Sequence, residues 1–219
     1  MSAEKYIKST FIFGLFISCL CLFDSCRKEQ EMTVYGDVLD GNTKELLSSI
    51  PIILSYSSVQ NGVYSSGYSL LAKGSTNESG NYRLDFERSS VVDYLMEVNA
   101  PEYFLYQEKV DRDEWSPKEE NRYDIELYLA TNLRLHIVNR TSASNTLTLD
   151  MGDHSPNCPS CCPQEKLYFS GLVDTILDCK IYGNQIVPYT ANVINSLNSS
   201  DVSGEINLNN QVVEYEIFF

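Results

Sequence analysis

The stretch Thr76-Asn-Glu-Ser-Gly-Asn-Tyr-Arg-Leu-Asp-Phe86 decides how the fold of this chain is interpreted. Its first half has the residue types that tight turns require, because Gly can adopt a positive φ and Asn and Ser can hydrogen-bond the local backbone. The hydrophobic period then becomes two, with Tyr82, Leu84 and Phe86 on one face. The stretch predicts a half-buried strand that leaves a tight corner and closes a small β-sandwich.

The same alternation recurs along the chain, and no helix of three turns is predicted after the first 25 residues. Further extended segments are expected at 34–38, 50–56, 68–76, 94–98, 123–130, 133–137, 167–169, 174–182, 185–194, 205–208 and 212–219. Many short strands separated by turn residues are typical of β-sandwiches. We therefore predict an all-β chain of two tandem β-sandwich domains (transthyretin/Ig-like), at residues 33–131 and 132–219. The last two segments are expected to form a hairpin around Asn209-Asn210.

The composition fits a folded protein and argues against nucleic acid as a partner. Of the 219 residues, 43% are hydrophobic and 21% charged, and Tyr occurs 15 times. Aromatic and β-branched residues pack well on pleated sheets, which supports the all-β prediction. The formal net charge of -14 repels phosphate backbones.

The amino terminus has the pattern of an export signal. Lys5 and Lys8 precede the mostly apolar stretch 10–23, which is too short to span a bilayer comfortably. Cys26 follows Ser25 directly and resembles the lipid-modified cysteine of bacterial lipoproteins. That resemblance implies a signal peptide at 1–25 and a lipidated tether at 26–32.

The residues after Cys26 carry a second resemblance. Arg27-Lys-Glu-Gln-Glu31 is similar to the acid-containing export signal of Bacteroidetes-type surface lipoproteins. It implies a protein of the outer membrane, held there through its lipid anchor and facing outward. The alternatives are a cleaved ordinary signal peptide and an uncleaved anchor.

The first predicted sandwich resembles a known domain family. The segments 34–38, 40–43, 50–54, 76–84 and 94–103 are similar to the carboxypeptidase regulatory-like domain, a transthyretin-like sandwich. The resemblance covers about residues 33–105, and the segment 123–130 completes the fold. It implies a non-catalytic module for folding support, spacing or binding, and it carries over no catalytic residue.

Four cysteines remain after the signal and Cys26, and their even number in an exported protein predicts two disulfides. They are Cys158, Cys161, Cys162 and Cys179. Pairing of the adjacent Cys161 and Cys162 is strained, so Cys179 is expected to take one of the three loop cysteines. The alternative is zinc, since His154 and the three loop thiols include a C-x-x-C spacing.

Two further residues are candidates for interaction. Trp115, the only tryptophan, lies in the charged stretch 111–120. If exposed it could stack on a sugar or anchor a partner, and the alternative is a ring folded onto the sandwich. Asp174-Thr-Ile176 matches the O-glycosylation pattern of Bacteroidetes, which implies possible modification at Thr175.

No catalytic motif is recognisable: nucleophile elbow, P-loop, dinucleotide fingerprint and His-Glu-x-x-His are all missing from the sequence. We therefore expect no enzyme and no cofactor. The favoured interpretation is a surface lipoprotein that acts as a binding or scaffold module for a glycan or a protein. The alternatives are a structural accessory subunit of an envelope assembly and a metal-binding protein built on the cysteine cluster.

Overall fold

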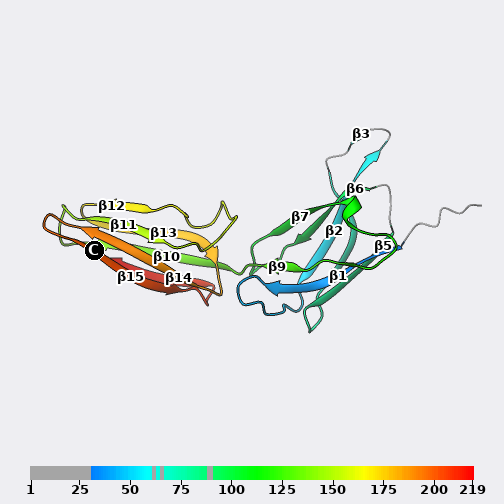
Figure 1. Ribbon diagram of the computed structural model, residues 1–219, viewed down its shortest axis with the longest axis horizontal. Helices are drawn as coiled ribbons and strands as arrows, with labels where there is room; N and C mark the ends of the chain where they lie inside the picture. The colour runs from blue at the N-terminus through cyan, green and yellow to red at the C-terminus, as the bar shows by residue number, and fades with distance from the viewer. Residues whose placement is uncertain (1–30, 61–62, 65–66, 88–90) are drawn as a thin grey trace, which may run out of the picture.

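The computed structural model describes residues 31–60, 63–64, 67–87 and 91–219. Within these ranges the chain is almost entirely β-strand, with one short 3-10 helix, η1 (Arg112–Glu114). Two β-sandwiches lie end to end and give the molecule an elongated shape (Figure 1). The predicted fold class, all-β with two tandem sandwiches, is confirmed. The predicted signal peptide, Cys26 and most of the tether lie outside the described residues.

The first sandwich is built from two sheets. In one sheet β1 (Glu31–Asp40) lies between the antiparallel β5 (Asn81–Glu87) and two short parallel strands, β8 (Asn121–Arg122) and β9 (Ile125–Leu127). The other sheet has the order β4 (Ser69–Ser75), β2 (Pro51–Gln60), β6 (Val91–Val98) and β7 (Tyr106–Asp111), and β3 (Val63–Tyr64) pairs with the end of β2.

The corner at residues 77–80 carries the chain from one sheet to the other. The Asn77 side-chain oxygen accepts hydrogen bonds from the backbone N–H groups of Ser79 and Asn81, at 2.9 and 3.0 Å. Gly80 has φ +73°, and a Cβ there would lie 2.7 Å from the Cβ of Leu46, so both its conformation and its surroundings favour glycine. The corner therefore starts β5 with Tyr82, Leu84 and Phe86 buried in the core, as the alternation predicts.

The second sandwich also has two sheets. The first sheet has the order β13 (Val173–Tyr182), β10 (Ala130–Asn139) and β16 (Val212–Phe218), with β16 parallel to β10. The second sheet has the order β12 (Leu167–Ser170), β11 (Thr146–Met151), β14 (Ile186–Ile194) and β15 (Ser199–Asn207). Leu133, Leu135, Leu147 and Leu149 are buried between the sheets.

The predicted hairpin around Asn209-Asn210 is wrong. β15 pairs with β14, whereas β16 pairs with β10 in the other sheet. The intervening Leu208 is fully buried, and its backbone N–H donates to the carbonyl of Gln185 at 2.9 Å. The segment therefore crosses between the sheets, because burying Leu208 in the core directs the chain away from β15.

The two sandwiches are joined by a short junction that is extensively bonded. The ring of Tyr182 stacks on that of Tyr128, with centroids 4.1 Å apart and an interplanar angle of 11°. The Asn42 amide donates to the Gly183 carbonyl at 2.7 Å, and the Asn184 amide donates to the Asp40 carboxylate at 2.8 Å. Ring stacking and two long-range side-chain hydrogen bonds therefore restrain the angle between the sandwiches.

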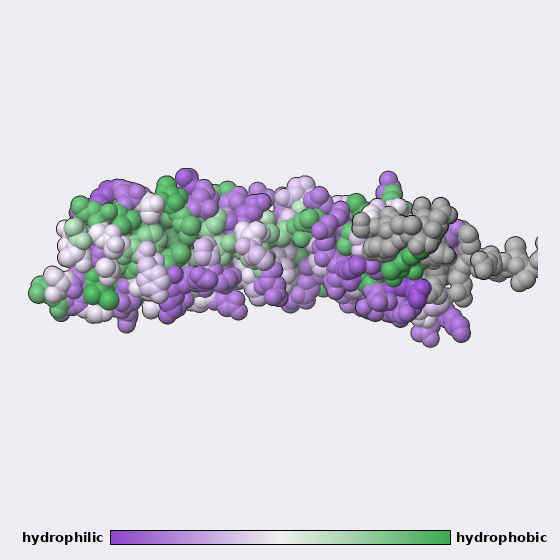
Figure 2. Space-filling view, turned by 90° about the horizontal axis from the view of Figure 1, so that it is seen from above, coloured by the Kyte–Doolittle hydropathy of each residue, from purple (hydrophilic) through white to green (hydrophobic). Residues whose placement is uncertain are grey.

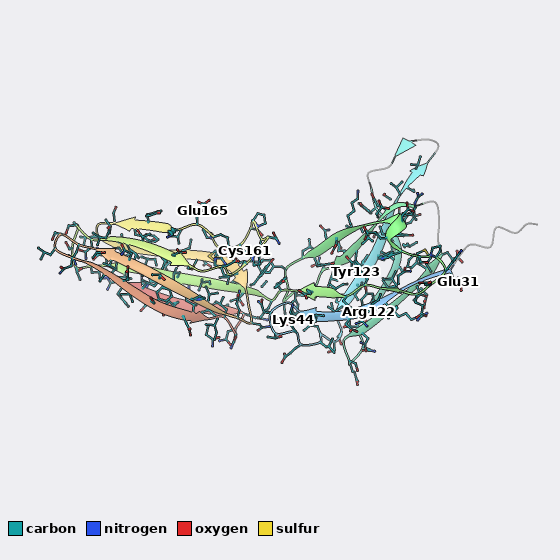
Figure 3. All side chains as sticks on the ribbon, in the orientation of Figure 1. Glu31, Lys44, Arg122, Tyr123, Cys161 and Glu165 are labelled. Carbon is teal, nitrogen blue, oxygen red and sulfur yellow. A yellow bond between two sulfur atoms is a disulfide. The ribbon has the colours of Figure 1, made fainter. Side chains whose placement is uncertain are left out.

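The elongated shape places Glu31, the start of β1, at the end of the first sandwich that is remote from the second (Figure 3). The chain ends within the second sandwich (Figure 1). Over the described ranges we find no helix with the length and apolar character needed to cross a membrane.

Candidate functional site

Trp115 belongs to the core of the first sandwich and is not available as a binding platform. Only 5% of its surface is exposed. Its ring stacks on Tyr94 at a centroid distance of 4.8 Å and meets Tyr123 edge-on at 5.9 Å. The binding role considered for Trp115 is thus corrected to a packing role. The charged residues around it are explained by η1, in which the Asp111 carboxylate accepts from the backbone N–H of Asp113 and the chain then turns the ring inward.

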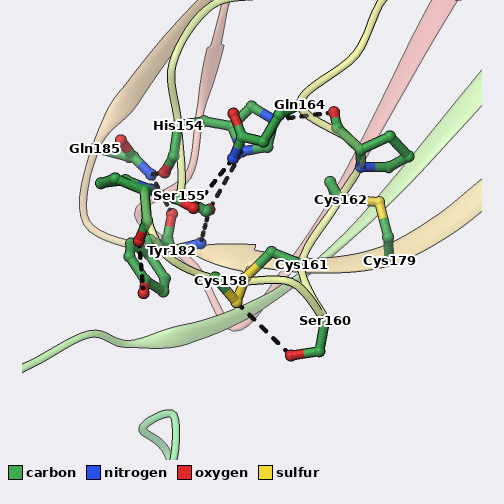
Figure 4. The surroundings of a disulfide bond; sticks show 12 residues. His154, Ser155, Cys158, Ser160, Cys161, Cys162, Gln164, Cys179, Tyr182 and Gln185 are labelled. Atoms are coloured by element: carbon green, nitrogen blue, oxygen red, sulfur yellow. Dashed lines mark hydrogen bonds between the residues drawn. A yellow bond between two sulfur atoms is a disulfide. The ribbon is translucent and has the colours of Figure 1, made fainter.

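The four cysteines form two disulfides, Cys158–Cys161 and Cys162–Cys179. Figure 4 shows both bonds, the second of which ties the irregular 152–166 loop to strand β13. The Cys162 backbone N–H also donates to the Lys180 carbonyl at 2.7 Å. As predicted, Cys179 pairs with one of the loop cysteines.

The disulfides remove the thiolates that the zinc alternative requires, because each of the four sulfur atoms is already bonded to another sulfur. In the part of the chain that the structure describes, no three His, Cys, Asp or Glu side chains are grouped to hold a metal ion. His154, the fourth ligand considered, belongs to the same loop and is buried. The metal-binding alternative is therefore wrong for the chain in which both disulfides are formed.

His154 instead helps to organise the loop against the junction (Figure 4). Its ring nitrogens lie 3.2 Å from the Ser155 hydroxyl and 3.4 Å from the Pro163 carbonyl. Burial lowers the pKa of His154, so the neutral ring is favoured. The Ser155 hydroxyl accepts from the backbone N–H of Tyr182 at 3.0 Å. The disulfide loop therefore supports the same tyrosine that stacks on the first sandwich.

The outer face of the β13–β10–β16 sheet is covered by charges that neutralise one another. His136 lies between two carboxylates, 2.7 Å from Asp174 and 3.0 Å from Glu216. The hydrogen bond to Asp174 has the larger effect and that to Glu216 the next. Both raise the pKa of His136 and so favour its charged form. Arg134 similarly bonds Glu214 at 2.8 Å. The sequence places His136 on this face, but partners 38 and 80 residues away become evident only from the strand register.

Thr175 is exposed on β13, at the edge of this sheet. The neighbouring Asp174 carboxylate is bound by His136 and by Arg140, the latter at 2.7 Å. The structure thus leaves the Thr175 side chain accessible, and its glycosylation stays a prediction.

The outer face of the β12–β11–β14–β15 sheet is different, because hydroxyl and amide groups dominate it. One row of outward residues crosses all four strands in register: Tyr168, Thr148, Asn192 and Asp201. Tyr168 is 73% exposed. The Asn192 amide donates to the Asp201 carboxylate at 2.6 Å and to the Ser199 hydroxyl at 3.2 Å. We call these outward-facing residues, with Thr146, Ser170, Thr190 and Ser203 beside them, the hydroxyl face.

Among the shallow depressions on the described part of the molecule are ones with volumes of ≈ 270, ≈ 260 and ≈ 100 Å³. Each is smaller than the ~300 Å³ at which small-molecule pockets typically begin. The ≈ 100 Å³ depression lies on the outer face of the β13–β10–β16 sheet, and His136 and Arg134 are among the residues that line it.

Comparisons with solved structures return matches of low similarity. The Bacillus anthracis TIE protein is 12% identical with a TM-score of 0.37, and the match covers 86% of this chain and 34% of that one. Shaft pilin SpaA from Lactobacillus rhamnosus GG is 9% identical at a TM-score of 0.33, covering 86% and 97%. A candidate carbohydrate-binding protein from Bacteroides uniformis ATCC 8492 is 12% identical at 0.31, covering 81% and 99%.

These TM-scores are too low to define a shared fold or function, and this chain spans about a third of the length of the TIE protein. No family model matches the sequence, and no curated protein matches it. The resemblance of residues 33–105 to the carboxypeptidase regulatory-like domain therefore stays a prediction from the sequence.

Proposed function

We propose that the chain is a non-enzymatic lipoprotein of the outer membrane, in which the first sandwich is a stiff support and the second sandwich binds a partner outside the cell. The observation that carries this proposal is the restrained junction, where Tyr182 stacks on Tyr128 and two amide hydrogen bonds cross between the sandwiches. A restrained junction transmits a fixed orientation from the attached end to the free end.

The position of β1 supports attachment at one end. Glu31 lies five residues after Cys26, so an extended tether would span at most about 17 Å. Acylation of Cys26 would therefore hold the first sandwich close to the bilayer, and several acyl chains would make the attachment firm. The second sandwich would be presented at the far end (Figure 3).

The surface of the second sandwich supports a binding role for that unit. Among the described residues, nine of the fourteen exposed large hydrophobic side chains belong to it, including Tyr168, Leu197 and Phe218. Figure 2 shows apolar residues gathered over the second sandwich, while the first is mainly hydrophilic in that view. Contiguous exposed apolar patches rimmed by polar residues are typical of interaction sites.

Attachment is tested by feeding cells an alkyne analogue of palmitate and detecting the labelled protein. We expect label in the natural chain and in Cys19→Ser, a matched change within the predicted signal, and no label in Cys26→Ser. Label that persists in Cys26→Ser would contradict the anchor.

Outward display is tested with an epitope inserted in the Asn195–Asn198 turn, between β14 and β15. Antibody should reach the epitope on intact cells. Reaction only after lysis would show that the second sandwich faces the periplasm. Stoichiometric co-purification with an envelope complex, together with no binding partner outside the cell, would favour the accessory-subunit alternative.

A further inference from the structure

We propose that the hydroxyl face of the second sandwich binds a neutral polysaccharide chain. This inference rests on the proposed function of the second sandwich as a binding unit, and it names the face and the partner's chemistry. Three features of the face support it: the register of the outward residues, their unused hydrogen-bonding capacity and the distribution of charge.

The register lays out a continuous polar track. Tyr168, Thr148, Asn192 and Asp201 face outward from four adjacent strands. Neighbouring strands are about 4.8 Å apart, so this row is about 14 Å long, which suits an extended oligomer rather than a single small molecule. The residues that alternate with this row along β11 and β14, such as Leu149 and Ala191, are buried, so the row itself lies on the outer face of the sheet.

Six hydroxyl groups on this face have no hydrogen-bond partner in the described part of the chain. In the described ranges, none of the hydroxyls of Thr146, Thr148, Thr190, Ser170, Ser203 and Tyr168 makes a hydrogen bond to another protein group. A hydroxyl can donate and accept, as can each hydroxyl of a sugar, so the two sets can replace each other's water without burying a charge.

Tyr168 adds an apolar platform to the track. Its ring is 73% exposed on the edge strand β12. Tyrosine offers a rigid, amphipathic contact area at a small entropic cost, while Ser and Asn supply adaptable hydrogen bonds. The C–H face of a pyranose ring is apolar and can pack on such a ring. At the other end of the row, Asp201 provides a strong acceptor beside the Asn192 amide.

The charge distribution selects a neutral partner. The chain carries a net charge of -14, which disfavours anionic polymers. On the hydroxyl face Asp150 is paired with Lys166 at 3.2 Å, and Asp201 and Glu205 are the remaining acids. The opposite outer face already pairs Arg134, His136 and Arg140 with carboxylates. Unused polar groups on the hydroxyl face are therefore mainly uncharged, as are those of neutral glycans.

The test is affinity electrophoresis of the full chain carrying Cys26→Ser in gels that contain dextran, mannan, xylan or polygalacturonate. We expect at least one neutral polysaccharide to retard the protein. Tyr168→Ala should weaken that Kd about tenfold or more, and Thr148→Val with Thr190→Val, which removes two hydroxyls at constant shape, about threefold or more. Leu70→Ala is the matched control, because Leu70 is 60% exposed on β4 of the first sandwich; its Kd should not change.

Retardation by polygalacturonate alone, by none of the four polymers, or equally in Tyr168→Ala would overturn the inference, as would weaker binding by Leu70→Ala. Unchanged thermal unfolding of each variant shows that its fold is intact. If acylation at Cys26 and outward display hold while every polysaccharide fails, then this inference is wrong and the proposed display function stands.

Discussion

The two sandwiches share one construction principle but are stabilised differently. The first has an aromatic centre, in which Trp115 packs between Tyr94, Phe86 and Tyr123, and it contains no disulfide among its described residues. The second has a largely aliphatic core and two disulfides in its loop. The difference predicts that the first sandwich depends for its stability on the aromatic core, and the second on the disulfides of its loop.

The largest expected effect is a loss of stability confined to the first sandwich. Trp115→Ala removes the largest ring of a core in which the tryptophan is 5% exposed. Such changes cost about 3–5 kcal/mol of unfolding free energy. Hydrogen exchange read by mass spectrometry should show faster exchange in peptides of residues 31–127 and little change in β10–β16. Equally faster exchange in both sandwiches would contradict the expectation that the substitution destabilises the first sandwich alone.

Removing a disulfide should lower the unfolding free energy of the second sandwich. The Cys162–Cys179 bond closes a separation of 17 residues and Cys158–Cys161 one of 3. Loop-closure entropy then predicts a loss of about 3 kcal/mol for Cys162→Ala with Cys179→Ala, and about 2 kcal/mol for Cys158→Ala with Cys161→Ala. Urea unfolding monitored for each sandwich checks this order, and a larger loss for the Cys158/Cys161 pair would reverse it.

A smaller effect is expected where the sandwiches meet. Tyr128→Leu keeps apolar bulk but removes the stack on Tyr182. Aromatic pairing contributes about 1 kcal/mol beyond buried area, so the fold should survive while the junction loosens. Small-angle X-ray scattering should change from that of one extended particle to that of a mixture of bent ones. Phe218→Leu, an exposed change far from the junction, should leave the scattering unchanged.

The smallest effect concerns the two histidines, whose pKa values move in opposite directions. Asp174 and Glu216 raise the pKa of His136 above its ordinary value of 6.5, so its stabilising contribution is present below that pH and is lost as pH rises through the folded-state pKa. Burial lowers the pKa of His154, so acidification below 6.5 opposes folding there. NMR titration should resolve both, and Asp174→Asn should lower the pKa of His136 only.

Alternation predicted the strands well because one face of each strand must be buried. Tyr82, Leu84 and Phe86 are buried as expected, and β2 begins at Pro51, where a strand tolerates a missing N–H. The corner before β5 was equally predictable, since its Asn and Gly serve local backbone needs. These features depend on residues close together in the sequence.

Features that depend on distant residues could not be predicted. The chain crosses from one sheet to the other at Asn209-Asn210 because Leu208 is buried. The inward position of Trp115 depends on the aromatic rings of β5 and β6. The hydroxyl face requires the register of four strands, which alternation within any one strand does not define. The even number of cysteines did predict disulfides. The pairing of Cys179 with Cys162, however, depends on the position of the loop beside β13.

The restrained junction is the claim on which the proposed display function depends most. Residual dipolar couplings of backbone amides, measured in one weakly aligning medium, test it most directly. If the junction is restrained, a single alignment tensor should fit the amides of β1–β9 and of β10–β16 together. Two tensors of clearly different magnitude would show that the sandwiches move independently, and would contradict it.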